Sequence, residues 1–135
     1  VPYYEDIDIA ASIRGMNNDY PEKPSFFINY RDFNDCTAYL PVVGDSMYPK
    51  YASGEIIAVK QITNMDMILW GEAYLIIGNS NTDNLRTIKL VHPCDDNTKF
   101  VLRASNPNFK GDTIINKDDI VNLFIVKGKI VRNQL

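Results

Sequence analysis

Short runs of apolar residues alternate with turn-forming residues along most of the chain and predict β-strands. From Tyr39 onward these runs are rich in β-branched and aromatic residues, and clusters of Gly, Asn, Asp and Pro separate them. This spacing is typical of an all-β sandwich or a barrel-like sheet. The runs cover residues 39–43, 55–61, 73–77, 87–91, 100–104 and 120–131. The pattern therefore predicts a mostly β fold.

The first 38 residues differ in composition, with prolines and polar clusters instead of apolar runs. We expect an extended N-terminal arm over residues 1–38, with one short strand at 26–30, and a β-rich core over residues 39–135. No stretch keeps a helical period over three turns, and only residues 64–70 are expected to form a helical turn. Gly128 inside the last apolar run predicts a bulge or bend.

Composition and charge argue against several classes of protein. The 135 residues suit one compact domain, and a net charge of −3 argues against a stand-alone nucleic-acid binder. No apolar run reaches the roughly 20 residues of a membrane span, so no membrane contact and a cytoplasmic location are expected. Cys36 and Cys94 are expected to stay reduced. The single histidine, His92, is interpreted as a surface turn residue, and we predict no metal and no cofactor.

The segment Val42-Val43-Gly44-Asp45-Ser46-Met47-Tyr48-Pro49 carries the clearest candidate chemistry. A predicted strand ends before Gly44, which permits a turn with unusual backbone angles. Ser46 then lies at the mouth of the turn, where its hydroxyl can meet a substrate and its N–H can stabilise a developing oxyanion. Taken alone, the segment also fits an ordinary turn, because Asp and Ser are common turn residues.

A serine nucleophile needs a base, and a lysine serves only when it is neutral at the working pH. Its pKa must then fall by about 3 units from about 10.4, which requires an apolar site without a carboxylate. Lys89 fits because no acidic residue lies within five positions of it. Strand alternation places it on one face with Thr87, opposite Ile88 and Leu90, and a solvated Lys89 is the alternative. Lys60 competes, but Glu55 and a polar strand exit suit it less.

Together these residues resemble the C-terminal domain of LexA-like and phage-type self-cleaving repressors, a family that includes UmuD and is related to signal peptidases. The resemblance spans nearly the whole chain and rests on Gly44-Asp45-Ser46-Met47, Gly54-Glu55, Ile88-Lys89 and Ser105-Asn106-Pro107. It implies a β-barrel-like sheet with an extended N-terminal arm. It also implies that Ser46 is the nucleophile and Lys89 the general base, with Gly44, Met47 and the Ser46 N–H at the cleft.

The resemblance further implies that the chain cuts itself. The family usually cleaves an Ala-Gly bond before its catalytic core, and the corresponding residues here are Ala11 and Ser12. Ser12 in place of Gly makes the bent backbone costlier by about 1 kcal/mol, so the sequence leaves open whether cleavage is slowed or lost. A plain linker of small residues is the alternative interpretation of this segment.

Partners are implied in the same way. The chain begins at Val1, and we expect it to be a fragment of a phage-type or SOS-like transcriptional repressor. Its helix-turn-helix domain would lie upstream and bind DNA, a homodimer would set the half-site spacing, and a RecA filament would activate cleavage. The apolar strand at residues 120–131 is the expected pairing edge. The main alternative is a catalytically decayed dimerisation module; a signal peptidase and a generic β-barrel ligand binder are weaker ones.

Overall fold

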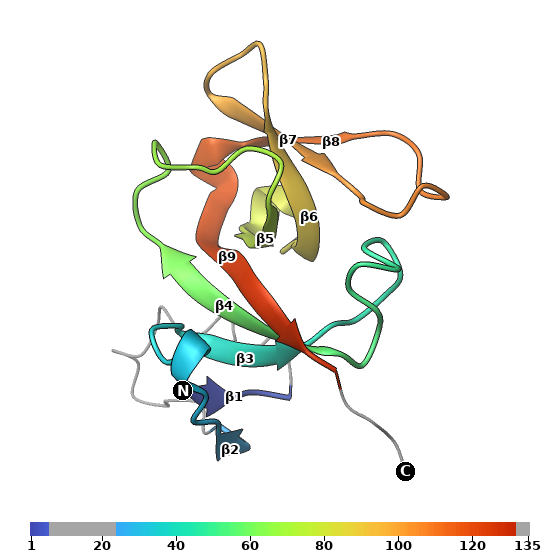
Figure 1. The fold of residues 1–135 in the computed structure, drawn as a ribbon. Coiled ribbons are helices and arrows are strands. Elements are labelled where there is room, and N and C mark those ends of the chain that lie inside the picture. Colours follow the sequence, from blue (N-terminus) through green and yellow to red (C-terminus); the bar gives the residue numbers. More distant parts are fainter. Residues whose placement is uncertain (6–23, 132–135) are drawn as a thin grey trace.

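One nine-stranded mixed β-sheet organises the computed structural model, which describes residues 1–5 and 24–131 (Figure 1). The strands are β1 (Pro2–Tyr3), β2 (Phe26–Phe27), β3 (Ala38–Pro41), β4 (Ile56–Ile62), β5 (Ala73–Gly78), β6 (Arg86–Pro93), β7 (Lys99–Arg103), β8 (Thr113–Asn116) and β9 (Ile120–Ile130). Short 3-10 helices are η2 (Arg31–Phe33), η3 (Ser80–Thr82) and η4 (Lys117–Asp119). The mostly β fold is confirmed.

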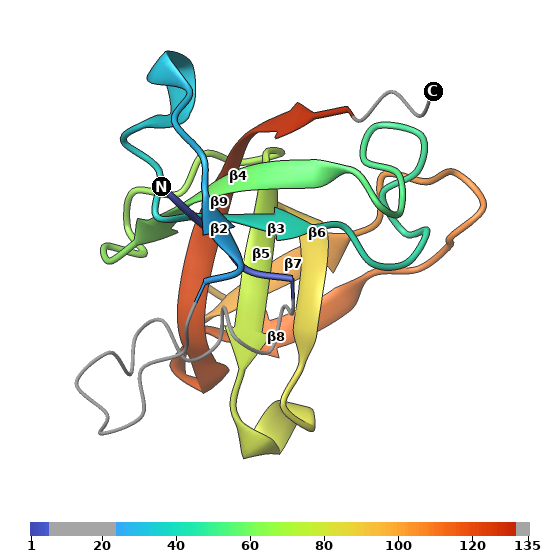
Figure 2. The ribbon, with the colours of Figure 1, turned by 90° about the horizontal axis from the view of Figure 1, so that it is seen from below.

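The strand order is β2-β1-β3-β4-β9-β5-β6-β7-β8, and β1 pairs with β3 in parallel while the other pairs are antiparallel. The long strand β9 joins the two halves, because its residues 123–130 pair with β4 and its residues 120–125 pair with β5. β3 and β4 therefore run across β5 and β6 (Figure 2). The order ends at β2 and β8, so the described sheet is open and not a closed barrel.

The core follows from alternation along the central strands. All six residues of β5 are buried, which matches its uninterrupted apolar sequence. Leu75 and Ile77 pack in a cluster with residues of β3, β4 and β9, whereas Tyr74 and Ile76 pack in a second cluster with residues of β6, β7 and β8. Successive side chains of a strand point to opposite faces, so β5 contributes to the core on both sides.

Several of the predicted strands and turns differ from those in the structure. β1 and β8 were not expected, and β2 is shorter than the expected strand at 26–30. The single turn expected within residues 64–70 is present, since the Met67 N–H donates to the Asn64 carbonyl at 3.1 Å, but it does not continue into a helix. The bend expected at Gly128 is confirmed, since Ala58 pairs with Gly128 but Val59 pairs with Val126. The division into an arm and a core stays a prediction.

The pairing edge expected at residues 120–131 is wrong for residues 123–125. β4 and β5 flank residues 123–125 on both sides, so their backbone groups already have partners. Residues 126–130 pair with β4 alone. The sequence suggested an edge because the strand is long, apolar and late in the chain, but those same features suit a strand at the centre of a sheet.

Candidate active site

The loop between β3 and β4 carries Ser46, and its two ends are fastened together. The Val42 N–H donates to the Glu55 carbonyl at 2.8 Å, and the Gly54 N–H donates to the Val42 carbonyl at 2.9 Å. Gly44 has a φ of +87°, a conformation that a residue with a side chain rarely adopts. The sequence therefore shapes a closed loop whose sharp turn presents Ser46.

The exit of this loop is held by a contact that the sequence did not reveal. Lys129 of β9 donates from Nζ to the Lys50 carbonyl at 2.6 Å and lies 3.3 Å from Glu55 Oε1. Glu55 in turn accepts a hydrogen bond from the Ala52 N–H at 2.6 Å. One carboxylate thus links the loop to the central strand, which limits how far the segment after Ser46 can shift.

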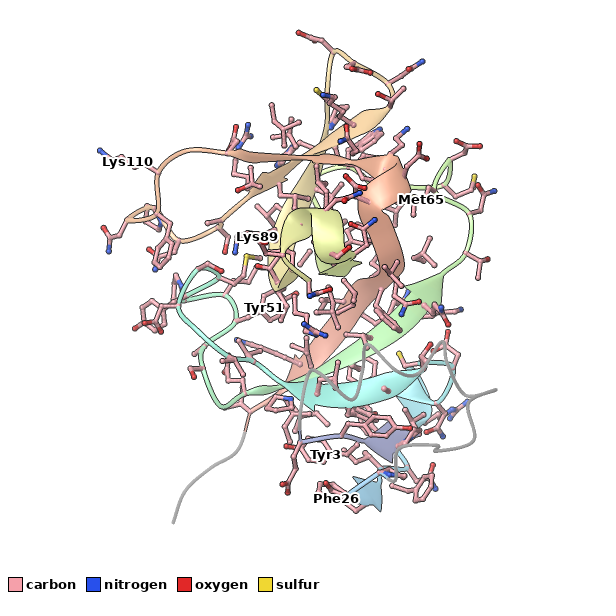
Figure 3. The ribbon with its side chains drawn as sticks, turned by 180° about the vertical axis from the view of Figure 1, so that it is seen from behind. Tyr3, Phe26, Tyr51, Met65, Lys89 and Lys110 are labelled. Carbon is pink, nitrogen blue, oxygen red and sulfur yellow. The ribbon has the colours of Figure 1, made fainter. Side chains whose placement is uncertain are left out.

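Ser46 and Lys89 lie together although 43 positions separate them. Lys89 Nζ is 2.8 Å from Ser46 Oγ and 2.8 Å from Thr87 Oγ1. The Ile88 carbonyl lies 3.5 Å from the same nitrogen. Lys89 extends from β6 toward the loop between β3 and β4 (Figure 3). A neutral amine that donates its two N–H groups to Thr87 and Ile88 keeps its lone pair for the Ser46 hydroxyl.

The surroundings of Lys89 favour the neutral amine. Burial lowers the pKa of Lys89 from its ordinary value, because the charged form loses water. Within residues 1–5 and 24–131, no carboxylate forms an ion pair with it. Lys60 differs: its Nζ lies 3.3 Å from Asp35 Oδ2, and 45% of its side chain is exposed. The two lysines that compete in the sequence are therefore distinguished by their environments.

A small cavity adjoins Ser46. Its volume is about 120 Å³, and its walls include Val42, Gly44, Met47 and Thr87 together with Ser46. Met47 is 2% exposed and belongs to the core cluster between β3 and β5, so the residue after the nucleophile anchors the loop in the core. A cavity of this size and lining suits a small apolar side chain beside the Ser46 hydroxyl.

Other residues singled out in the sequence lie elsewhere. Ala11 and Ser12 fall outside the described residues. The interpretation of His92 as a surface turn residue is wrong: it lies inside β6, pairs with Val101 of β7 and is partly buried. Strand β6 continues to Pro93 because β7 supplies a partner. In the described part of the chain, both cysteines are free and no group of His, Cys, Asp or Glu is arranged to hold a metal ion.

Comparison with known sequences decides the family. The sequence model of the family described as Peptidase S24-like matches residues 2–131. The chain belongs to the Peptidase S24-like family. This membership confirms the resemblance to LexA-like self-cleaving proteins, and the family is one of serine peptidases. A search of curated proteins finds no significant match. Among the described residues of this S24-like chain, no helix has the length and apolar character to cross a membrane.

Proposed function

We propose that this S24-like domain is a self-cleaving serine peptidase in which Ser46 is the nucleophile and Lys89 the general base. The observation that carries the proposal is the 2.8 Å separation between Ser46 Oγ and Lys89 Nζ, at a lysine whose pKa burial lowers. Desolvation favours the amine that can accept a proton, and hydrogen-bond reach allows the transfer. Family membership supports a peptidase of this general kind.

The proposed substrate is the Ala11–Ser12 bond of the same chain. Ser46 Oγ attacks the Ala11 carbonyl carbon while its proton passes to Lys89 Nζ, and the carbonyl oxygen becomes an oxyanion that the Ser46 N–H stabilises. The tetrahedral intermediate collapses when the Lys89 ammonium gives its proton to the Ser12 nitrogen, which leaves as an amine. Water then hydrolyses the ester between Ser46 and Ala11: Lys89 takes a proton from the attacking water and returns it to Ser46 Oγ, which leaves as the hydroxyl.

The test is incubation of the chain at about pH 10, where a buried lysine is neutral, followed by intact mass measurement. We expect a peptide ending at Ala11 in the wild type and none in Ser46→Ala or Lys89→Met. Lys60→Met is the matched control, because Lys60 pairs with Asp35 and lies in a different environment. Cleavage in Ser46→Ala, or its loss in Lys60→Met, would contradict the assignment.

If the wild-type chain stays intact, either the Ala11–Ser12 bond is a poor substrate or the Ser46–Lys89 dyad is inactive. One substitution distinguishes these two explanations. Ser12→Gly restores backbone freedom at the proposed scissile bond and leaves Ser46 and Lys89 unchanged. Cleavage of this variant alone would locate the defect in the bond. If Ser12→Gly also stays intact at alkaline pH while folded, the dyad is inactive, and the dimerisation module becomes the better function.

We further propose that the domain serves a transcriptional repressor as its homodimerisation unit, with DNA binding through an upstream helix-turn-helix domain and a RecA filament as activator. Family membership supports a LexA-like domain in general. Sedimentation at micromolar concentration is the test of self-association. A monomer throughout that range would contradict the dimer.

A further inference from the structure

The turn that carries Ser46 is held by a second loop, at residues 105–106, far away in the sequence. Among the described residues, the buried polar side chains are those of Asn106 and Asn122. Asn106 is 7% exposed, although it lies in a loop between β7 and β8 whose next residues, 107–112, are all exposed. A buried amide needs hydrogen-bond partners, so its contacts indicate what it does.

Those contacts fall on successive carbonyls of the nucleophile turn. Asn106 Nδ2 donates to the Asp45 carbonyl at 2.8 Å, and the Asn106 N–H donates to the Ser46 carbonyl at 3.0 Å. Ser105 Oγ donates to the Met47 carbonyl at 3.2 Å. Three consecutive carbonyls therefore accept from residues 105 and 106, and two of them also accept from within the loop: Asp45 from the Tyr48 N–H at 3.1 Å and Met47 from the Tyr51 N–H at 2.9 Å.

Peptide geometry converts these contacts into an orientation of N–H groups. In a trans peptide the C=O and the following N–H lie in one plane and point in opposite directions. When the Asp45 carbonyl points at Asn106, the Ser46 N–H must point away from it. When the Ser46 carbonyl points at the Asn106 N–H, the Met47 N–H must likewise point away from Asn106. Neither N–H donates a backbone or side-chain hydrogen bond within the described residues, so both remain available for an oxyanion.

We propose that Asn106 is a positioning residue that sets the oxyanion-binding N–H of Ser46 by fixing the Asp45 carbonyl. The inference rests on the proposed peptidase function and extends it to a residue that touches neither the reacting atoms nor Lys89. The Asn106 Oδ1 also accepts a hydrogen bond from the Asn108 N–H at 3.0 Å, which fixes the amide so that Nδ2 faces Asp45. The Asn106 side chain is therefore fixed through Oδ1 by the Asn108 N–H and contacts the turn that carries Ser46 through Nδ2.

Two substitutions separate the two ends of the amide. Asn106→Ala removes both contacts. Asn106→Asp keeps an oxygen for the Asn108 N–H but loses the donor to Asp45. The matched control is Asn122→Ala, which removes the other buried asparagine, on β9, where its Oδ1 accepts from Gln61 Nε2 at 3.3 Å. Thermal unfolding of each variant checks that rates are compared among folded proteins.

The readout is covalent labelling of Ser46 by a fluorophosphonate, followed by intact mass against pH. The Ser46 oxygen bonds to phosphorus, fluoride leaves, the proton passes to Lys89, and the phosphoryl oxygen needs the same N–H groups as an oxyanion. We expect both Asn106 variants to label about 100-fold more slowly than wild type on the alkaline plateau, as for the loss of an oxyanion donor. The midpoint pH of Asn106→Ala and the rate of Asn122→Ala should equal those of wild type.

Each other outcome is informative. A plateau like that of wild type in Asn106→Ala or Asn106→Asp overturns the inference, as does an equal loss in Asn122→Ala. A shifted midpoint with an unchanged plateau in Asn106→Ala assigns the residue to Lys89 instead, and also overturns it. A wild type that labels but does not cleave itself refutes the proposed self-cleavage and leaves the Asn106 comparison decisive. A wild type that does neither refutes both.

Discussion

A carboxylate placed beside Lys89 should convert the peptidase into one that works only at higher pH. Thr87 is the position to change, because its Oγ1 lies 2.8 Å from Lys89 Nζ. Thr87→Asp puts a negative charge at nearly the same place, and an opposite charge favours the ammonium form. The substitution therefore acts on the feature that the proposal needs most, a lysine without an anionic partner.

The magnitude follows from the distance and the burial. Two unit charges about 3 Å apart attract by about 1.4 kcal/mol in water and about 5 kcal/mol at an effective dielectric constant of about 20. Lys89 is only partly buried, so water screens the pair and the lower half of this range applies. A rise of about 1–2 pKa units lowers the neutral fraction, and hence the cleavage rate below the pKa, by about 10–100-fold.

The assay is the first-order rate of self-cleavage against pH, with Thr87→Asn as the neutral variant of the same shape. We expect Thr87→Asp to be slower than Thr87→Asn at moderately alkaline pH and to approach it as the pH rises further. Equal rates for the two variants at every pH would refute the reasoning, because charge beside Lys89 would then have no effect. A deficit that higher pH does not recover would refute it as well.

Two further predictions concern stability. Because burial lowers the pKa of Lys89 in the folded state, the unfolded chain binds more protons between the folded and unfolded pKa values, so stability rises with pH through that window. Lys89→Met should therefore raise the Tm near neutral pH, with a gain over wild type that shrinks toward the ordinary lysine pKa; a gain independent of pH in thermal scans would contradict this. A methyl group at Gly128 would collide with the ring of Phe33, so Gly128→Ala should cost about 1–3 kcal/mol in urea unfolding. Phe33→Ala should make the same change nearly neutral, and additive costs in the double variant would show that the two residues do not meet.

The sequence predicted the strands that have strong apolar runs and missed those that lack them. β5 and β9 are long and apolar, and both are confirmed. β8 was missed because only Ile115 of its four residues is buried, and β1 because two residues carry no pattern. Turn-forming residues around Ser46 indicated the loop, since Gly44 needs its positive φ. Alternation placed Lys89 and Thr87 on one face, and their hydrogen bond agrees.

The hydrogen bonds that hold the Ser46 loop in place could not be predicted from local sequence patterns. Asn106 reaches a carbonyl 61 positions away, and Lys129 reaches one 79 positions away. Nothing near either residue indicates such a partner, because the contact exists only once the sheet has brought the loops together. His92 was misjudged for a related reason: the following proline suggested a turn, but pairing with β7 continues the strand. Tertiary pairing, not local preference, fixed these positions.

The ionisation of Lys89 tests the central claim most directly. Lysine labelled with ¹³C at Cε, in the Ser46→Ala chain so that no cleavage intervenes, gives one NMR signal for each lysine, and the Lys89→Met variant identifies the signal of Lys89. The account predicts that this signal titrates below the ordinary lysine value of about 10.4, because burial lowers the pKa of Lys89. A Lys89 signal that titrates together with the exposed lysines would contradict the account.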